Sequence, residues 1–99
     1  MYQGQIDGGL IQGLGYALME GLAFEEGRVT SLNLHEYKLP GVADVPPLTT
    51  ILLEPDLSLG ITPIGEGPNC GMSAAIATAV MGVMGEQVEI PLAPEALFR

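Results

Sequence analysis

The chain has 99 residues, of which 47% are hydrophobic and 15% are charged; this composition fits one small folded domain, residues 1–99, and excludes a disordered chain. Twelve acidic residues against three basic ones give a formal net charge of −9. Because this charge repels phosphate groups, we expect neither nucleic acid nor an anionic membrane surface as a partner.

The first predicted element is a helix over residues 7–22, with Asp7 as its N-cap. Apolar side chains recur in it at spacings of three and four and form one stripe, which consists of Leu10, Ile11, Leu14, Leu18 and Leu22. The same region is rich in residues that weaken a helix, namely Gly8, Gly9, Gly13, Gly15 and Gly21. We expect these glycines to permit close contact with a helix, a strand or a ligand, and protein packing is the favoured interpretation.

Two short strands are predicted next, over residues 29–34 and residues 48–54. Glycine and proline then dominate residues 56–69, which favours a loop whose shape is set by its backbone.

A second helix is predicted over residues 71–84, capped by Asn69 or Ser73, ended by Gly85 and nearly all buried. It is too short to span a membrane. An extended segment over residues 87–92 follows. We therefore predict an α+β fold in which two apolar helices pack on a small mixed sheet.

Glu66 stands between two glycines just before this second helix. In a cramped loop with apolar walls, desolvation would disfavour its ionised form and make it a better proton acceptor, as a general base requires. Alternatively, the carboxylate simply interacts with the positive end of the helix dipole. From physical chemistry alone the second interpretation is favoured.

Three segments together resemble the molybdopterin-binding subunit of the molybdenum hydroxylases, the family of xanthine dehydrogenase and aldehyde oxidase. They are, in family order, Gln5-Ile6-Asp7-Gly8-Gly9 with Gln12-Gly13-Leu14-Gly15, then Asn33-Leu34-His35-Glu36-Tyr37-Lys38-Leu39-Pro40 extended by Asp44-Val45-Pro46, and finally Gly65-Glu66-Gly67-Pro68. The resemblance covers nearly the whole chain and identifies it with the C-terminal part of that subunit.

This resemblance implies a molybdenum–pyranopterin cofactor in the complete enzyme and a hydroxylation of an N-heterocycle or aldehyde, with Glu66 as the general base. It further implies that Gln5 hydrogen-bonds the pterin and that the backbone from Gly65 through Gly67 to Gly71 lines the site. Gln12 has either a cofactor role or a structural role within its helix.

The chain also departs from the family pattern. Thr62 and Pro63 stand where the family commonly has a lysine, and Asn69-Cys70 replaces apolar residues, which leaves the substrate open. The family's other molybdenum-site loops have no counterpart here, so we expect this chain alone to bind no cofactor. The expected partners are the remainder of the molybdopterin-binding subunit and iron–sulfur and FAD subunits or domains.

Two other functions are weighed against this one. A chain of this length buries only about 60% of the surface of its unfolded form, so it needs a partner or forms a homo-oligomer, and a non-catalytic interaction module is the first alternative. The second is an anion site in the loop at residues 65–71, against which the charge of Glu66 argues.

Cys70 and His35 are the remaining candidates for chemistry. Cys70 is the only cysteine, which excludes an internal disulfide and, with no signal-peptide pattern, favours the cytoplasm. We interpret Cys70 as a buried apolar side chain rather than a reactive thiol. His35 has no second ligand at metal-binding spacing, so no metal site is expected on it.

Overall fold

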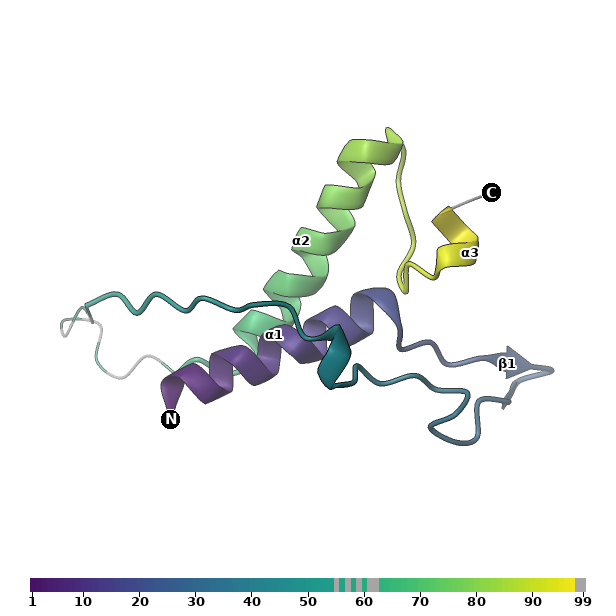
Figure 1. The fold of residues 1–99 in the computed structure, drawn as a ribbon, viewed down its shortest axis with the longest axis horizontal. Coiled ribbons are helices and arrows are strands. Elements are labelled where there is room, and N and C mark those ends of the chain that lie inside the picture. The colour runs from purple at the N-terminus through teal and green to yellow at the C-terminus, as the bar shows by residue number, and fades with distance from the viewer. Residues whose placement is uncertain (55, 57, 59, 61–62, 98–99) are drawn as a thin grey trace.

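The computed structural model describes residues 1–54, 56, 58, 60 and 63–97. Two long helices dominate it, α1 (Tyr2–Leu18) and α2 (Gly67–Met84), and they cross near the start of α2 (Figure 1). Between them lie a hairpin of two short strands, β1 (Phe24–Glu25) and β2 (Arg28–Val29), and one turn of 3-10 helix, η1 (Val42–Asp44). A short helix, α3 (Pro94–Leu97), follows α2.

The glycines of α1 bring the first turns of α2 into close contact. A side chain on Gly13 would overlap the backbone of Asn69 and the Cβ of Met72, and one on Gly9 would lie 3.0 Å from the Cβ of Pro68. The hydroxyl of Ser73 adds a hydrogen bond to the carbonyl oxygen of Gly13 at 3.0 Å. Gly9 and Gly13 therefore pack against another helix of the protein, which is the interpretation that the sequence analysis favoured.

The buried core is small and lies at the C-terminal half of α1. Leu14, Ala17 and Leu92 are its buried hydrophobic members among the described residues. The backbone N–H of Leu92 donates to the carbonyl of Ala17 at 2.6 Å, so the segment after α2 folds back onto α1. This return places the segment after α2 against the C-terminal half of α1.

The bounds of α1 differ from the prediction. The helix begins at Tyr2 and ends at Leu18 rather than covering residues 7–22. Asp7 is not the N-cap: it lies inside the helix, where its carboxylate accepts a hydrogen bond from the hydroxyl of Thr50 at 3.0 Å. Contacts with distant segments therefore override the weak helix propensity of the glycines.

The bounds of α2 also differ. It begins at Gly67, with Glu66 as N-cap, and neither Asn69 nor Ser73 caps it because both lie within its first two turns. Gly85 ends it in the left-handed conformation, φ +73°, as predicted.

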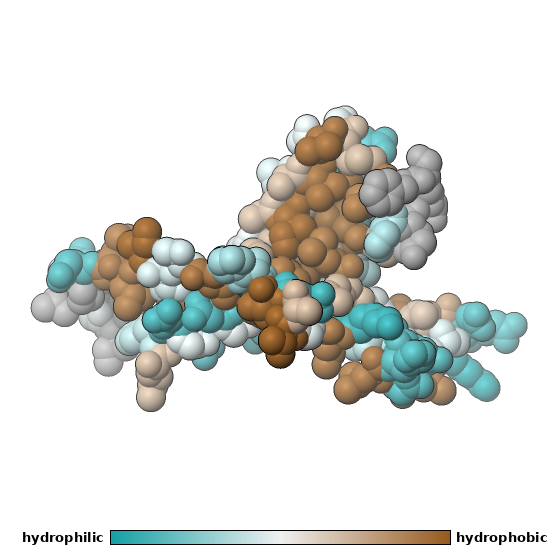
Figure 2. All heavy atoms as spheres, viewed as in Figure 1, coloured by the Kyte–Doolittle hydropathy of each residue, from teal (hydrophilic) through white to brown (hydrophobic). Residues whose placement is uncertain are grey.

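The expectation that this second helix is nearly all buried is wrong for the chain by itself. No residue of α2 is buried, and Val83 is 87% exposed. The reason is that α1 covers only one side of it; Figure 2 shows apolar side chains gathered on the open face of α2.

The α+β class with two helices is confirmed, but the sheet is smaller than predicted. It is an antiparallel hairpin, with Phe24 opposite Val29 and Glu25 opposite Arg28, rather than a mixed sheet. Of the strand predicted over residues 29–34 only Val29 is in it, and residues 48–54 form no strand with the described part of the chain. The long helices contact each other, while the hairpin extends beyond the end of α1 (Figure 1).

Candidate functional site

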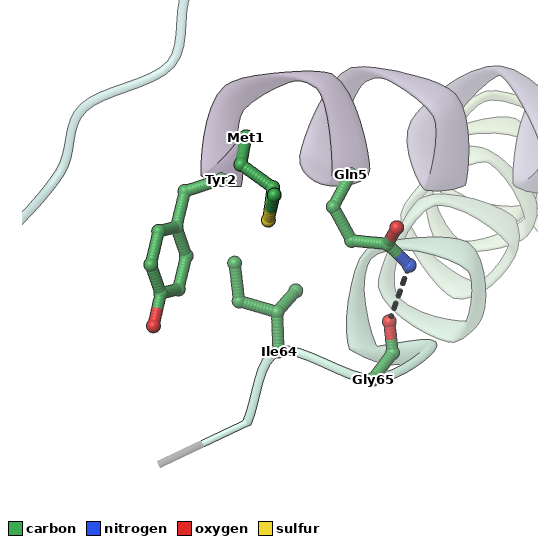
Figure 3. Close-up of a pocket in the computed structure, with 5 residues that line it drawn as sticks. All are labelled: Met1, Tyr2, Gln5, Ile64 and Gly65. Carbon is green, nitrogen blue, oxygen red and sulfur yellow. Dashed lines mark hydrogen bonds between the residues drawn. The ribbon is translucent and has the colours of Figure 1, made fainter. Parts of the chain in front are cut away.

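The turn that carries Glu66 is tied to the first turns of α1. The side-chain amide of Gln5 donates to the carbonyl oxygen of Gly65 at 3.2 Å (Figure 3). Gly65 has φ +56°, a left-handed conformation that favours glycine. The bond joins residues that are 60 positions apart, so the first and third sequence motifs meet at one place.

Glu66 itself stands at the junction of this turn and α2. Its backbone carbonyl accepts from the N–H groups of Asn69 at 3.1 Å and Cys70 at 3.3 Å. Its side chain is exposed and makes no capping hydrogen bond to the helix N-terminus. The structure thus offers no hydrogen bond for the interpretation of Glu66 as a capping side chain. Its exposure also differs from the cramped loop with apolar walls that the general-base interpretation expected, because no described segment of this chain covers the turn.

A shallow cavity of about 270 Å³ adjoins this turn. It is lined by Met1, Tyr2, Gln5, Ile64 and Gly65. Figure 3 shows the Tyr2 ring and the Ile64 side chain on one side, with the Gln5–Gly65 hydrogen bond on the other. The cavity therefore has apolar walls and a polar amide at one end, one residue away from Glu66.

The glycines proposed as cofactor contacts have open faces. A Cβ on Gly65, Gly67 or Gly71 would meet no described atom within 4 Å.

Gln12 is not brought to the turn. It is exposed, and its side chain makes no hydrogen bond to the described residues. It lies seven residues after Gln5, so both point to the same side of α1, about 10 Å apart. Any group that contacts both would have to extend along the helix.

Cys70 and His35 are both exposed. The expected burial of Cys70 is wrong in this chain, because the first turns of α2 contact α1 through Pro68, Asn69 and Met72, and Cys70 lies on another side. Within the described residues no three His, Cys, Asp or Glu side chains are grouped as metal ligands.

None of the described helices has the length and apolarity needed to cross a membrane.

One polar contact was not predicted. The hydroxyl of Tyr37 donates to the Glu20 carboxylate at 2.8 Å. This hydrogen bond, together with partial burial and the negative charge of Glu20, raises the pKa of Tyr37 above its ordinary value of 10.0. The two residues are 17 positions apart, and no local sequence pattern signals the contact.

Comparison with known proteins bears on these residues. Residues 1–46 match the molybdopterin cofactor-binding domain family. Nearly the whole chain aligns with a probable xanthine dehydrogenase subunit of Bacillus subtilis, 36% identical over 98% of this chain and 14% of that protein. The xanthine dehydrogenase molybdenum-binding subunit of Escherichia coli O157:H7 is 34% identical over 97% of this chain and 14% of that protein.

A solved structure agrees with the sequence comparisons. Quinoline 2-oxidoreductase from Pseudomonas putida 86 superposes with a TM-score of 0.88 at 31% identity, over 99% of this chain and 14% of that chain. The chain belongs to the molybdenum hydroxylase family. It corresponds to a segment of the molybdenum-binding subunit of xanthine dehydrogenase-like enzymes and spans 14% of the length of these relatives.

Proposed function

We propose that this chain is the C-terminal part of a molybdopterin-binding subunit and supplies Glu66 as the general base of a molybdenum hydroxylase. The observation that carries the proposal is the hydrogen bond between Gln5 and Gly65. This bond brings together two sequence motifs. According to the family resemblance, the motif of Gln5 contacts the cofactor and the motif of Gly65 carries the base, Glu66. Other polypeptide completes the pocket.

The residues present fit a molybdenum–pyranopterin group. The open faces of Gly65, Gly67 and Gly71 leave room for it. An amide side chain has two N–H donors and one acceptor oxygen, so Gln5 retains one donor and its oxygen after binding Gly65. When bound, this group supplies the centre at which the substrate is oxidised.

Within such a site the residues of this chain have three tasks. Glu66 accepts a proton through a carboxylate that the turn leaves accessible. Gln5 holds the turn against α1, which fixes the direction in which the Glu66 side chain leaves the backbone. Tyr2 and Ile64 form an apolar wall on one side of the cavity.

The remaining partners follow from the chemistry. Electrons removed from an N-heterocycle or aldehyde leave through iron–sulfur and FAD groups that other chains or domains provide. We place the assembly in the cytoplasm, where the single thiol, Cys70, stays reduced. Gln12 extends the cofactor contact along α1 in this proposal.

A non-catalytic interaction module is the second candidate. The exposed apolar face of α2 favours it, because such faces are covered in stable proteins. An oligomer of this chain that takes up no cofactor would be its signature.

Molybdenum content distinguishes the two. The whole chain replaces the segment of the E. coli O157:H7 subunit that aligns with it, and the graft is purified with that enzyme's own partner chains. Metal analysis is expected to find about one molybdenum per grafted subunit. The control is the same subunit with the aligned residues deleted, and a graft with no more molybdenum than this control would contradict the proposal.

A further inference from the structure

The segment between η1 and the turn before α2 is unusually free of backbone partners. From Val45 to Glu54 it runs drawn out along the molecule (Figure 1), and Val45 has an extended backbone with φ −76° and ψ 113°. No N–H or C=O group of residues 46–54 makes a backbone hydrogen bond to any residue that the structure describes. Its one side-chain bond to a helix joins Thr50 to Asp7.

The side chains of this segment are those of a buried strand. Residues 48–54 read Leu-Thr-Thr-Ile-Leu-Leu-Glu, rich in β-branched and apolar types, and prolines flank them on both sides. Yet Ile51, Leu52 and Leu53 are 80%, 61% and 87% exposed. Unpaired backbone groups beside exposed apolar side chains form a template for another strand.

The surface of the whole chain indicates what covers this template. Its accessible surface is 7891 Å², whereas a compact monomer of this mass exposes about 5,400 Å². The excess, on the order of 2,500 Å², is typical of a permanent interface between polypeptides. The relatives are about seven times as long as this chain, which spans 14% of their length, and the additional polypeptide is enough to supply such an interface.

We propose that residues 48–54 form a β-strand that pairs with a strand of the polypeptide completing the subunit. The inference rests on the proposed function in that this polypeptide is the rest of the molybdopterin-binding subunit. Pairing satisfies the free backbone groups, and the sheet buries the three exposed apolar side chains. It also anchors α1, because Thr50 remains bonded to Asp7.

Amide hydrogen exchange measures the pairing directly. Exchange is followed in the isolated chain at low concentration and in the E. coli graft described above, with the α1 amides of residues 13–17 as internal control. We expect the amides of residues 48–54 to exchange without protection in the isolated chain and at least about tenfold more slowly in the graft. Protection in the isolated chain would overturn the proposal, because a second copy would then fill the edge.

A pair of double variants separates strand pairing from simple burial. Adjacent N–H groups of a strand point to opposite edges, so I51P/L52P removes a donor from whichever edge is paired. The control I51T/L52T keeps both donors and a strand-forming residue type. We expect the proline graft to lose the protection of residues 48–54 and the threonine graft to keep it; equal protection in both would overturn the proposal.

Amide protection and molybdenum content, measured on the same graft, distinguish failure of the strand proposal from failure of the proposed function. A graft in which residues 48–54 are protected but molybdenum is absent supports the strand and contradicts the proposed function. A graft that contains molybdenum but leaves residues 48–54 unprotected supports the proposed function and contradicts the strand.

Discussion

Gln5 connects α1 to the turn that carries Glu66, and this contact makes single residues testable. The side-chain amide of Gln5 donates a hydrogen bond to the carbonyl oxygen of Gly65, 60 positions later in the sequence. This bond joins α1 directly to the turn before α2. In the graft, Gln5→Leu is expected to lower the free energy of unfolding by about 0.5–1.5 kcal/mol, as expected for one hydrogen bond. Amide exchange at Gly67 should become faster, because the turn loses its anchor.

The control for this change is Gln3→Leu, since Gln3 is exposed on the same turn of α1 and its side chain makes no hydrogen bond to the described residues. Equal effects of the two variants, measured by denaturant unfolding, would show that the Gln5 contact contributes nothing.

Tyr37 gives a prediction that depends on pH. Its hydrogen bond to Glu20 raises its pKa in the folded chain, so the bond stabilises the fold below the ordinary pKa of 10.0 and this contribution is lost as pH rises through the folded value. Tyr37→Phe is expected to lower the melting temperature at pH 8, and the difference from wild type should shrink above pH 10. Thermal unfolding across this range checks it, with Tyr2→Phe as the control; a difference that does not change with pH would contradict the assignment.

At the scale of elements, the contact between α1 and α2 depends on the absence of side chains at particular positions. A methyl group on Gly13 would overlap Asn69 and Met72, whereas one on Gly8 would meet nothing within 4 Å. Gly13→Ala is expected to destabilise the fold by about 1–3 kcal/mol through overpacking. Gly8→Ala should instead stabilise it by about 0.5–1 kcal/mol, because alanine favours a helix more than glycine does.

Chemical denaturation of the two glycine variants in the graft measures these opposite signs. The same sign for both would mean that α1 and α2 do not cross at Gly13.

Both long helices were predictable, but their starts and the end of α1 were not. Apolar spacing identifies α1, and a run of Ala, Ile, Val and Met identifies α2. Gly85 marks the end of α2 because a left-handed residue is needed there. The first turn of α1 depends on Gln5 meeting Gly65, a contact that no local pattern contains. The predicted strand over residues 48–54 lacks a partner among the described residues, and a strand needs one to form.

The candidate site shows the same division. The position of Glu66 between glycines and before a helix was readable from the chain, and so was Gln5 through the family resemblance. The Glu20–Tyr37 contact was not, since it depends on how the loop after β2 returns to α1.

At the scale of the whole molecule, the chain is more open than a self-sufficient domain. Its radius of gyration is 16.3 Å, compared with about 13 Å for a compact domain of 100 residues. Apolar side chains are exposed on α2 and along residues 51–53 (Figure 2). Covering them requires other polypeptide, either the rest of the subunit or a second copy.

This exposure predicts self-association that depends on salt. The net charge of −9 keeps copies of the isolated chain apart at low ionic strength. Raising the salt concentration screens that repulsion while the apolar faces remain. Light scattering after size-exclusion chromatography should therefore find a larger mass in high salt than in low salt; a constant 10.3 kDa in both would contradict this picture.

The central claim is that Glu66 accepts a proton in the completed site. In the E. coli graft, Glu66→Gln keeps the shape of the side chain and removes its basicity, and Glu86→Gln is a matched control at the far end of α2. Steady-state xanthine oxidation is measured together with molybdenum content. The account predicts normal molybdenum in both variants, a kcat lowered about 10²- to 10⁴-fold by Glu66→Gln, and no change with Glu86→Gln. A Glu66→Gln graft with full molybdenum and unchanged kcat would contradict it.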